Sequence, residues 1–511
     1  MSNYIHVPNI IKWKEVVDNN YTLSSPQYKR LIMPNNNSKQ LKWFLERPLK
    51  KADFGVEIGA LNYIEESPFR FIRTKALQEY SFLLNINKET SLPIMPSEFV
   101  KMNLKEGDLI ISKDSNIGEI VILDKDYSNC MLSGALCKLP IKKEWAFYIL
   151  AFVKHSVFRE QLDYLVPKGA TIRHAKTLFL DCKIPIPNNN VEEEIRFVSI
   201  LTKAIVNKEK CIRQKHNSIL NIIDREIKDN QKETIFEYNY PCLKDIKEVK
   251  RLDASLYKEF FKRLSFNIIN YKYGFSPLTE QNLDLLPGPS LELKLLGTRI
   301  DSDKYIKGFY RLITPKQITN YGVTKNEQYI GTPTKIANIQ FGDILFGESG
   351  TGRTMVFLDR DSNTINNAHA HILRSKKKND LDRIITIRSI LQYYKEVGLT
   401  DCMTVGGSGG HLSPSYFDRI LIPHFPEYKQ KEIAVLYHNP QDTKTWDFTL
   451  DNFMELDNIF NQNAGIYELD GCAKFLKQQL KKVIDDIVND RPIDIKFCLK
   501  EIVKSMGKAH S

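Results

Sequence analysis

Two long stretches of the chain carry apolar residues at helical spacing and lack helix-breaking residues. Positions 191–228 contain no Gly or Pro, and apolar residues recur there at intervals of seven. Positions 466–487 alternate apolar residues by three and four before Pro492 closes the run. This periodicity predicts two long helices, each with a packing seam. The seam residues are Val198, Ile205, Ile212 and Ile219 in the first helix and Leu469, Leu476, Leu480, Val483 and Ile487 in the second.

The heptads leave open which surface covers each seam. Two helices with compatible heptads can pair as an antiparallel coiled coil. In the alternative arrangement, each helix is amphipathic and packs on its own domain. The polar segment 229–241 is the predicted crossing between the two halves of the chain, and segment 438–465 interrupts the second helical region.

A Gly-Asp pair precedes an apolar run in each half of the chain. Gly107-Asp108 leads into positions 109–111, and Gly342-Asp343 leads into 344–346. A Gly-containing segment follows each run, and a second apolar run comes next, at 119–123 or 355–358. A turn followed by apolar runs of this length is typical of β-strands, so each half is predicted to contain a β-hairpin.

These hairpins belong to an internal repeat. The Gly-Asp pairs lie 235 positions apart, and Arg70-Phe71-Ile72 matches Arg311-Leu312-Ile313 at an offset of 241. Segments 23–29 and 252–258 share Leu, Tyr and Lys at an offset of 229, and the Ile-Pro at 186–187 returns at 422–423. Four matches in one order and at nearly one offset indicate a duplicated unit of more than 200 residues.

The alternation of helix-type and strand-type segments predicts an α+β protein with two tandem domains of mixed α/β structure. The two long helices would separate these domains and give the chain pseudo-two-fold symmetry. The predicted boundaries are 1–190 for the first domain, 191–230 for the central helix, 231–427 for the second domain and 428–511 for the C-terminal helical region. A length of 511 residues also exceeds what one hydrophobic core usually organises.

The net charge is a weak indication of the partner. The chain has 73 Lys and Arg against 62 Asp and Glu, a formal charge of +11. Lys and Arg gain affinity for DNA by displacing condensed counterions from phosphates, but many basic proteins bind no nucleic acid. No apolar run approaches the roughly 18–20 residues of a membrane helix and the start lacks a secretory signal, so we expect a cytoplasmic protein.

The candidate catalytic and metal motifs lack the context that their chemistry requires. Segment 347–354 fits a phosphate-binding loop except that Arg353 replaces the lysine, but a strand-type run follows it where a helix is needed. His369 and His371 have no third ligand at metal-like spacing, and the cysteines form no C-x-x-C pair. Asn439-Pro440 does not continue into an adenine-methyltransferase motif. We therefore expect a non-catalytic chain without a metal.

The order of these elements resembles the specificity subunit of type I restriction-modification systems. Each half starts with Leu-[Ser/Asp]-x-x-x-Tyr and carries Gly-Asp-[Leu/Ile]-[Ile/Leu] in its middle. The first half then runs from Lys168-Gly169-Ala170-Thr171 to Ile186-Pro187 before its long helix. The resemblance covers nearly the whole chain. It implies a DNA-binding subunit with two target-recognition domains that each read one half of a split DNA sequence.

The resemblance also implies partners. Two modification subunits, which carry S-adenosylmethionine for DNA adenine methylation, would dock on the two helices whose seams are given above. Two motor-endonuclease subunits would join them for restriction, and this chain would need no cofactor of its own. A helix over 191–228 would be about 57 Å long, enough to hold apart two readers whose half-sites are about one 34 Å turn of DNA apart.

Polar side chains on loops read base edges, and nearby Lys and Arg hold phosphates. The loop of each predicted hairpin and the glycine-containing segment later in each half are therefore the candidate readers. In the first half the candidates are Asp114, Ser115, Asn116, Lys168, Thr171, Arg173 and His174; in the second they are Ser349, Thr351, Arg353, Ser408 and His411. Arg70, Arg73 and Arg311 are the candidates for phosphate contacts.

Three other functions fit parts of this pattern. The recognition subunit of a type IIB-like enzyme shares the domain pair but works with a fused methyltransferase-nuclease. A nucleotide hydrolase would use segment 347–354, and nucleotide binding would reveal it. A bivalent scaffold would bind proteins through both domains, and its weak affinity for DNA would depend little on salt.

Overall fold

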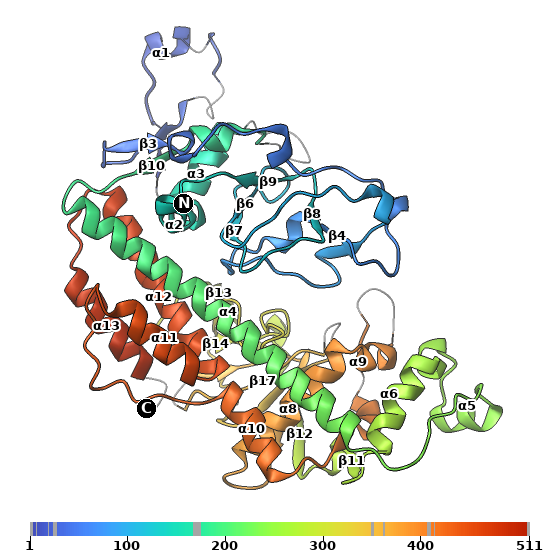
Figure 1. Cartoon of the computed structure of the whole chain (residues 1–511). Coiled ribbons are helices and arrows are strands. Elements are labelled where there is room, and N and C mark those ends of the chain that lie inside the picture. The colour runs from blue at the N-terminus through green and yellow to red at the C-terminus, as the bar shows by residue number, and fades with distance from the viewer. Residues whose placement is uncertain are drawn as a thin grey trace. The chain divides into compact units, whose positions relative to one another are not determined.

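The computed structural model describes residues 4–507 apart from 7, 19, 24–27, 167–174, 349–351, 361–362, 406–409 and 413. The chain divides into two compact units. Unit 1 comprises the described residues of Met1–Cys211, Gln441–Gln462 and Leu469–Ala509, and unit 2 comprises those of Ile212–Pro440 and Asn463–Glu468. Helices and strands occur in both units, which confirms the predicted α+β class (Figure 1).

Unit 1 contains two three-stranded sheets. Its strands are β1 (Ile5–His6), β2 (Arg30–Leu31), β3 (Ser38–Gln40), β4 (Arg70–Ile72), β5 (Ser91–Pro93), β6 (Leu109–Ser112), β7 (Ile120–Ile122), β8 (Cys130–Leu132), β9 (Leu136–Leu139) and β10 (Lys183–Pro185). One sheet has the order β5-β4-β8 and the other has the order β7-β6-β9. Two further pairs, β1 with β2 and β3 with β10, complete the strands of this unit.

Unit 2 contains two four-stranded sheets. Its strands are β11 (Phe275–Pro277), β12 (Leu283–Pro287), β13 (Ile300–Ser302), β14 (Tyr310–Leu312), β15 (Tyr329–Gly331), β16 (Ile344–Gly347), β17 (Thr354–Val356), β18 (Thr364–Ile365), β19 (Ala370–Ser375) and β20 (Leu421–Pro423). The sheets have the orders β13-β15-β14-β18 and β12-β19-β16-β17. Strands β11 and β20 form a separate pair.

Three strands of each sheet in unit 2 pair as the strands of unit 1 do, and β12 and β13 are additional edge strands. Strand β14 pairs antiparallel with β15 and parallel with β18, as β4 does with β5 and β8. Strand β16 lies between antiparallel neighbours β17 and β19, as β6 lies between β7 and β9. The pair β11–β20 corresponds to β3–β10. This shared topology confirms the internal repeat and both predicted hairpins.

The Gly-Asp turns have the same backbone geometry in both repeats. Gly107 has a φ of 88° and Gly342 a φ of 85°, in the left-handed region that favours glycine. The N–H of Gly107 donates to the carbonyl of Leu123 at 2.9 Å, and the N–H of Gly342 donates to that of Phe357 at 2.8 Å. Each glycine therefore reverses the chain at the entry to a hairpin.

The aspartates of these turns also hold equivalent positions. Asp108 pairs with Lys138 of β9 at 2.6 Å, and Asp343 pairs with Arg374 of β19 at 2.7 Å. The second pair is the more buried, because the side chain of Asp343 is 1% exposed and that of Asp108 is 20% exposed. The repeat thus preserves an ion pair while the cation and the burial differ.

A buried helical segment follows β9 in unit 1 and β19 in unit 2. In unit 1 it is α2 (Ala146–Lys154) and α3 (Ser156–Leu165), and in unit 2 it is α8 (Leu381–Glu396) and α9 (Leu399–Met403). Positions 148–153 and 384–394 are buried without interruption. A helix that is mostly apolar on all sides is expected inside a domain. The other short helices are α1 (Trp13–Asp18), α5 (Leu243–Val249), α6 (Glu259–Ile269) and α7 (Leu293–Leu296).

The predicted central helix is α4 (Val191–Asp229), and the C-terminal region consists of helices. These are α10 (Glu427–Tyr437), α11 (Phe453–Asn463), α12 (Ile466–Val488) and α13 (Ile495–Gly507). Segment 438–465, expected only to interrupt this region, contains α11. Every predicted seam residue of α4 and α12 is buried.

The half of α4 that belongs to unit 1 runs antiparallel to α12. Asn188, just before α4, donates to Asp490, just after α12, at 2.8 Å. Further along, Glu209 of α4 pairs with Lys477 of α12 at 2.7 Å. Helix α11 joins them, since Lys208 of α4 pairs with its Asp457 (Figure 1). The seam in unit 1 is therefore covered by the helices of the C-terminal region.

The half of α4 that belongs to unit 2 contacts the second repeat. The hydroxyl of Tyr393 on α8 donates to Asp224 at 2.7 Å, and that of Tyr271 donates to Glu226 at 2.8 Å. His216 lies beside the ring of Tyr321, with 5.2 Å between ring centroids.

The pseudo-two-fold relation between the repeats stays a prediction.

Candidate nucleic-acid interface

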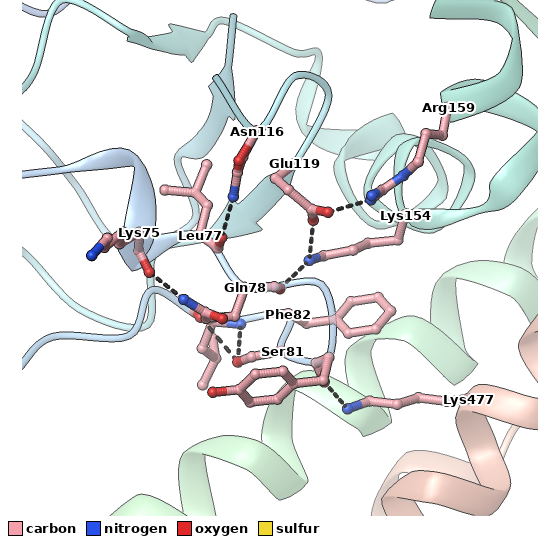
Figure 2. Close-up of polar contacts among 12 residues, drawn as sticks. Lys75, Leu77, Gln78, Ser81, Phe82, Asn116, Glu119, Lys154, Arg159 and Lys477 are labelled. Atoms are coloured by element: carbon pink, nitrogen blue, oxygen red, sulfur yellow. Dashed lines mark hydrogen bonds and ion pairs between the residues drawn. The ribbon is translucent and has the colours of Figure 1, made fainter. Parts of the chain in front are cut away.

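The hairpin loop of unit 1 is held to its surroundings by polar contacts. Asp114 pairs with Lys113 at 2.7 Å and its side chain is 14% exposed. Asn116 donates through Nδ2 to the carbonyl of Leu77 at 2.9 Å (Figure 2). Ser115 is exposed, with a φ of 66°. Among the three predicted readers on this loop, Ser115 is the most accessible, while Asp114 and Asn116 also shape the loop.

The hairpin of unit 2 connects two strands. The N–H of Gly347, at the end of β16, donates to the carbonyl of Arg353 at 2.9 Å, just before β17. Arg353 donates through Nη1 to the carbonyl of Ile318 at 3.2 Å. Ser349 and Thr351 lie outside the described residues. A phosphate-binding loop requires a helix at this point, so the strand β17 contradicts the nucleotide-hydrolase alternative.

The structure brings the two predicted reading segments together in each unit. The N–H of Ala175, directly after the first glycine-containing segment, donates to the carbonyl of Lys113 on the hairpin at 2.8 Å. In unit 2, the N–H of Leu412 donates to the carbonyl of Glu348 at 3.0 Å. These contacts are equivalent in the repeat. In each unit a main-chain hydrogen bond therefore joins the hairpin to the end of a glycine-containing segment.

The glycine-containing segments themselves are only partly described. His411 is exposed, and its backbone pairs with that of Val405 at 2.8 and 2.9 Å. The predicted readers Lys168, Thr171, Arg173, His174 and Ser408 lie outside the described residues.

The three arginines proposed for phosphate contacts differ in accessibility. Arg70 and Arg73 are exposed, and Arg70 donates weakly to the carbonyl of Ser91 at 3.4 Å. Arg311 is only 22% exposed and pairs with Asp359 at 2.6 Å. Burial lowers the pKa of Arg311, but Asp359 and Glu327 outweigh burial and raise it. The charge of Arg311 is thus compensated inside unit 2, so Arg70 and Arg73 are the stronger candidates.

A buried lysine supports the hairpin of unit 1. Lys154, the last residue of α2, donates to the carbonyl of Gln78 at 2.7 Å and pairs with Glu119 at 3.3 Å. Glu119 directly precedes β7 and also pairs with Arg159 of α3. Burial lowers the pKa of Lys154 to about 8, although Glu119 and Glu209 act to raise it. Figure 2 shows Lys154 reaching between the loop at 78 and the hairpin strand.

The loop that accepts from Lys154 is also joined to the helices of unit 1. Glu209 of α4 accepts from the hydroxyl of Ser81 and from the N–H of Phe82, both at 2.9 Å. Lys477 of α12 donates to the carbonyl of Tyr80 at 2.6 Å (Figure 2). A continuous set of polar contacts therefore joins the hairpin, the 78–83 loop, α4 and α12.

An arginine occupies the corresponding place in unit 2. Arg388 of α8 is fully buried and donates to the carbonyls of Thr354 at 3.0 Å and Asn320 at 3.1 Å. The ring of Tyr437 lies 5.0 Å from its guanidinium. Burial lowers the pKa of Arg388, while Tyr437 and Glu396 act to raise it.

The sequence reasoning missed both buried cations. A signal was present, because Lys154 and Arg388 are charged residues within the apolar runs AFYILAFVK and IITIRSIL, 234 positions apart. A charge at a repeated position in a buried helix is expected to have a buried partner. Searching the repeat for such positions would have identified them.

The predicted docking residues on the helices are not available to another protein. The seam side chains of α4 and α12 are buried within this chain. Another subunit that docks on these helices must therefore use their remaining surfaces.

The described residues hold no group of three or more His, Cys, Asp or Glu that could bind a metal. His371 lies on β19 near the ring of Phe417, with centroids 5.5 Å apart, in a largely buried position. None of the helices in the described ranges is both long and apolar enough to cross a membrane.

The chain matches no family model and no curated protein. Solved structures similar to it include the S subunit of the type I restriction-modification system of M. genitalium, at 12% identity and a TM-score of 0.40, covering 91% of this chain and 98% of that one. The HsdS subunit of Thermoanaerobacter tengcongensis has 12% identity and a TM-score of 0.25, covering 84% and 95%. A third solved structure is described by complex assembly and conformational transition of the type I R-M system. It has 11% identity and a TM-score of 0.28, covering 90% of this chain and 99% of that one.

The first of these structures is described as a type I S subunit and the second as an HsdS subunit. At such identities and TM-scores the similarities do not decide what the chain does. Its function has to follow from its own residues.

Proposed function

We propose that the chain is the DNA-recognition subunit of a type I restriction-modification complex, and that each repeat reads one half of a bipartite target. The observation that carries this proposal is the duplicated contact between two candidate reading segments. In each unit a hairpin loop meets the end of a glycine-containing segment, through Ala175 and Lys113 or through Leu412 and Glu348. Two copies of one reader in a single chain suit a target with two half-sites.

The chemistry of the exposed candidate residues suits base and phosphate contacts. Ser115 and His411 expose hydroxyl and imidazole groups that can donate or accept hydrogen bonds at base edges. Arg70 and Arg73 offer exposed guanidinium groups for phosphates. The chain would therefore supply specificity, while methylation and cleavage would belong to other subunits.

The complex we propose contains two modification subunits with S-adenosylmethionine and, for restriction, motor-endonuclease subunits. The modification subunits would dock on the surfaces of α4 and α12 that face away from the buried seams. The chain would work in the cytoplasm, where its DNA substrate lies. A type IIB-like assembly remains the alternative, and the coding sequences beside this one distinguish the two, since separate modification and motor genes indicate type I.

Binding across a salt series tests the DNA-binding part of the proposal. Fluorescence anisotropy with a labelled duplex should give an affinity whose logarithm falls with log salt by about 0.9 per phosphate contact. Arg73→Ala should reduce that slope by about 1, whereas Arg263→Ala, which removes an exposed arginine paired with Glu259 on α6, should leave it unchanged. A flat salt dependence of the wild type would favour a protein scaffold.

Reconstitution tests the assembly. The purified chain alone should neither methylate nor cut DNA, and adding the modification subunits should give sequence-specific adenine methylation. Sequencing the methylated bases of a host that expresses the whole system would identify both half-sites and their spacing. Methylation or cleavage by the purified chain alone would contradict the proposal.

A further inference from the structure

Each repeat places one buried cation at the foot of its hairpin. Lys154 and Arg388 are 234 positions apart, and their hairpin partners Glu119 and Thr354 are 235 apart, close to the offset of the Gly-Asp turns. Both cations come from the helical segment after β9 or β19, Lys154 from α2 and Arg388 from α8. The position is thus repeated although the residue type is not.

The two cations join the same pieces of structure. Each donates to a main-chain carbonyl in the loop after the β4 or β14 strand, at Gln78 or Asn320. Each also holds the start of the second hairpin strand, through the carboxylate of Glu119 or the carbonyl of Thr354. The hairpin and the neighbouring loop are therefore fixed to one helix by one side chain.

Core packing alone does not explain this choice of residue. Removing a charge from water is costly, and an apolar side chain of similar length often stabilises a core as well or better. In unit 2 the close fit extends to the loop, since a Cβ on Gly322 would lie 2.3 Å from Nη2 of Arg388. A buried cation with directed hydrogen bonds instead fixes one arrangement of the groups that it joins.

We propose that Lys154 and Arg388 are positioning residues that set the hairpin of each unit for reading its own half-site. This inference rests on the proposed function. Neither side chain would touch DNA, because both are buried and donate their hydrogen bonds to groups of their own unit. Each would act on the reading loop of its own repeat, so the effect of losing one should be confined to one half-site.

In unit 1 the same contacts continue to the helices. The 78–83 loop that Lys154 holds also binds Glu209 of α4 and Lys477 of α12. The orientation of this hairpin is therefore tied to the helices on which the modification subunits would dock.

The test uses the full-length chain and a duplex with both half-sites, together with duplexes in which one half-site or the other is scrambled. Lys154→Met should reduce the affinity ratio between intact and scrambled half-site by at least about tenfold at the half-site read by unit 1, as expected for a misplaced base contact. The ratio at the other half-site should stay within about twofold. Arg388→Met should give the opposite pattern.

Two control variants separate positioning from other effects. Lys154→Arg keeps a cation with several donors and should preserve the ratio, whereas a charge-independent packing role would let Lys154→Met preserve it too. Lys143→Met removes an exposed lysine just before α2 and should change neither ratio. If Lys154→Met does not fold, as judged by circular dichroism, Glu119→Gln weakens the same link without changing its shape.

The outcomes distinguish this inference from the proposed function. Equal losses at both half-sites, or no change with Lys154→Met and Arg388→Met, would overturn the positioning role while leaving DNA recognition intact. Failure of the wild type to discriminate either half-site identified by methylation would overturn the proposed function itself.

Discussion

The two units share much of their topology but compensate the buried cation beside each hairpin differently. Unit 1 pairs buried lysines with carboxylates, Lys154 with Glu119 and Lys208 with Asp457. Unit 2 buries Arg388 against main-chain carbonyls and an aromatic ring. The same link between helix and hairpin is therefore achieved by an ion pair in one repeat and by a guanidinium fork in the other.

The difference follows from the donors that each cation carries. An ammonium group is a compact charge with three donors, and a nearby carboxylate compensates its burial. A guanidinium group spreads its charge over a planar fork that can reach two carbonyls at once. Duplication thus preserved the geometry of the link rather than its charges, and each repeat should respond differently to mutation and to pH.

The largest expected effect concerns the buried pair between α4 and α11. Asp457→Ala leaves Lys208 without a carboxylate partner where both side chains are 0% exposed, so the free energy of unfolding of unit 1 should fall by about 3–5 kcal/mol. Asp451→Ala is the matched control, because Asp451 pairs with Arg196 of the same helix but is 86% exposed, and its loss should be below about 1 kcal/mol. Urea denaturation of both variants makes the measurement; similar losses would show that the buried pair has no special role.

The two hairpin cations should differ in their contribution to stability. Arg388→Met leaves the carbonyls of Thr354 and Asn320 without this donor. The free energy of unfolding should fall by about 1–3 kcal/mol for each carbonyl. Lys154→Met should cost less, about 1–2 kcal/mol, because Glu119 keeps Arg159 as a partner. Thermal and urea unfolding of the two variants compare them directly. Equal losses would contradict the distinction between ion pair and fork.

The pH dependence of stability should distinguish the repeats. Burial lowers the pKa of Lys154 from 10.5 to about 8, with Glu119 and Glu209 opposing the shift and Lys477 adding to it. Between pH 8 and 10.5 the unfolded chain then binds more protons at this site, so its contribution to stability rises with pH by up to about 1.4 kcal/mol per pH unit. Below pH 8 the contribution is constant.

Unfolding free energies of wild type, Lys154→Met and Arg388→Met between pH 7 and 10 measure this effect, since other titrating groups cancel in the differences. The unfolding free energy of the wild type should rise relative to that of Lys154→Met above about pH 8. Its difference from that of Arg388→Met should stay constant, because arginine keeps its proton. A constant difference for Lys154→Met would mean that its ammonium group keeps its proton throughout.

The smallest expected difference concerns the Gly-Asp turns. Asp343→Asn removes a carboxylate that accepts from Nε and Nη2 of Arg374 at 2.8 and 2.7 Å, and should cost about 2 kcal/mol. Asp108→Asn affects a pair whose side chains are 19% and 20% exposed, and should cost about 1 kcal/mol or less. Denaturation midpoints of the two variants provide the comparison, and a larger loss for Asp108→Asn would reverse it.

Much of the fold could be predicted because its signals are local or repeated. The absence of Gly and Pro over 191–228, together with the heptads, predicted a helix that the structure places at Val191–Asp229. The Gly-Asp pairs predicted the turns, since a left-handed φ before an apolar run depends on adjacent residues. The predicted interruption at 438–465 was only partly correct, because this segment contains α11. The sequence of α11 has no strong heptad repeat that would have predicted it.

The candidate site was predicted as two loops in each repeat, and the structure brings the described parts of those loops together. The individual residues were harder to rank. Arg311 has the sequence context of a phosphate contact, but its pairing with Asp359 depends on a residue 48 positions away. Asn116 similarly binds the carbonyl of Leu77, which no local pattern reveals.

The sequence by itself determined the main elements and the duplication and proposed the candidate reading segments, because periodicity, turn residues and repeated order can be read directly from the chain. Only the tertiary structure decided what covers the seams and which partners the buried cations have. Lys154 and Arg388 occupy the same place in the repeat, yet one meets Glu119 and the other meets the carbonyl of Thr354. The partner of a buried charge depends on contacts between distant segments of the chain. Burying the charge is unfavourable, and the polar group that the fold places beside it offsets this cost.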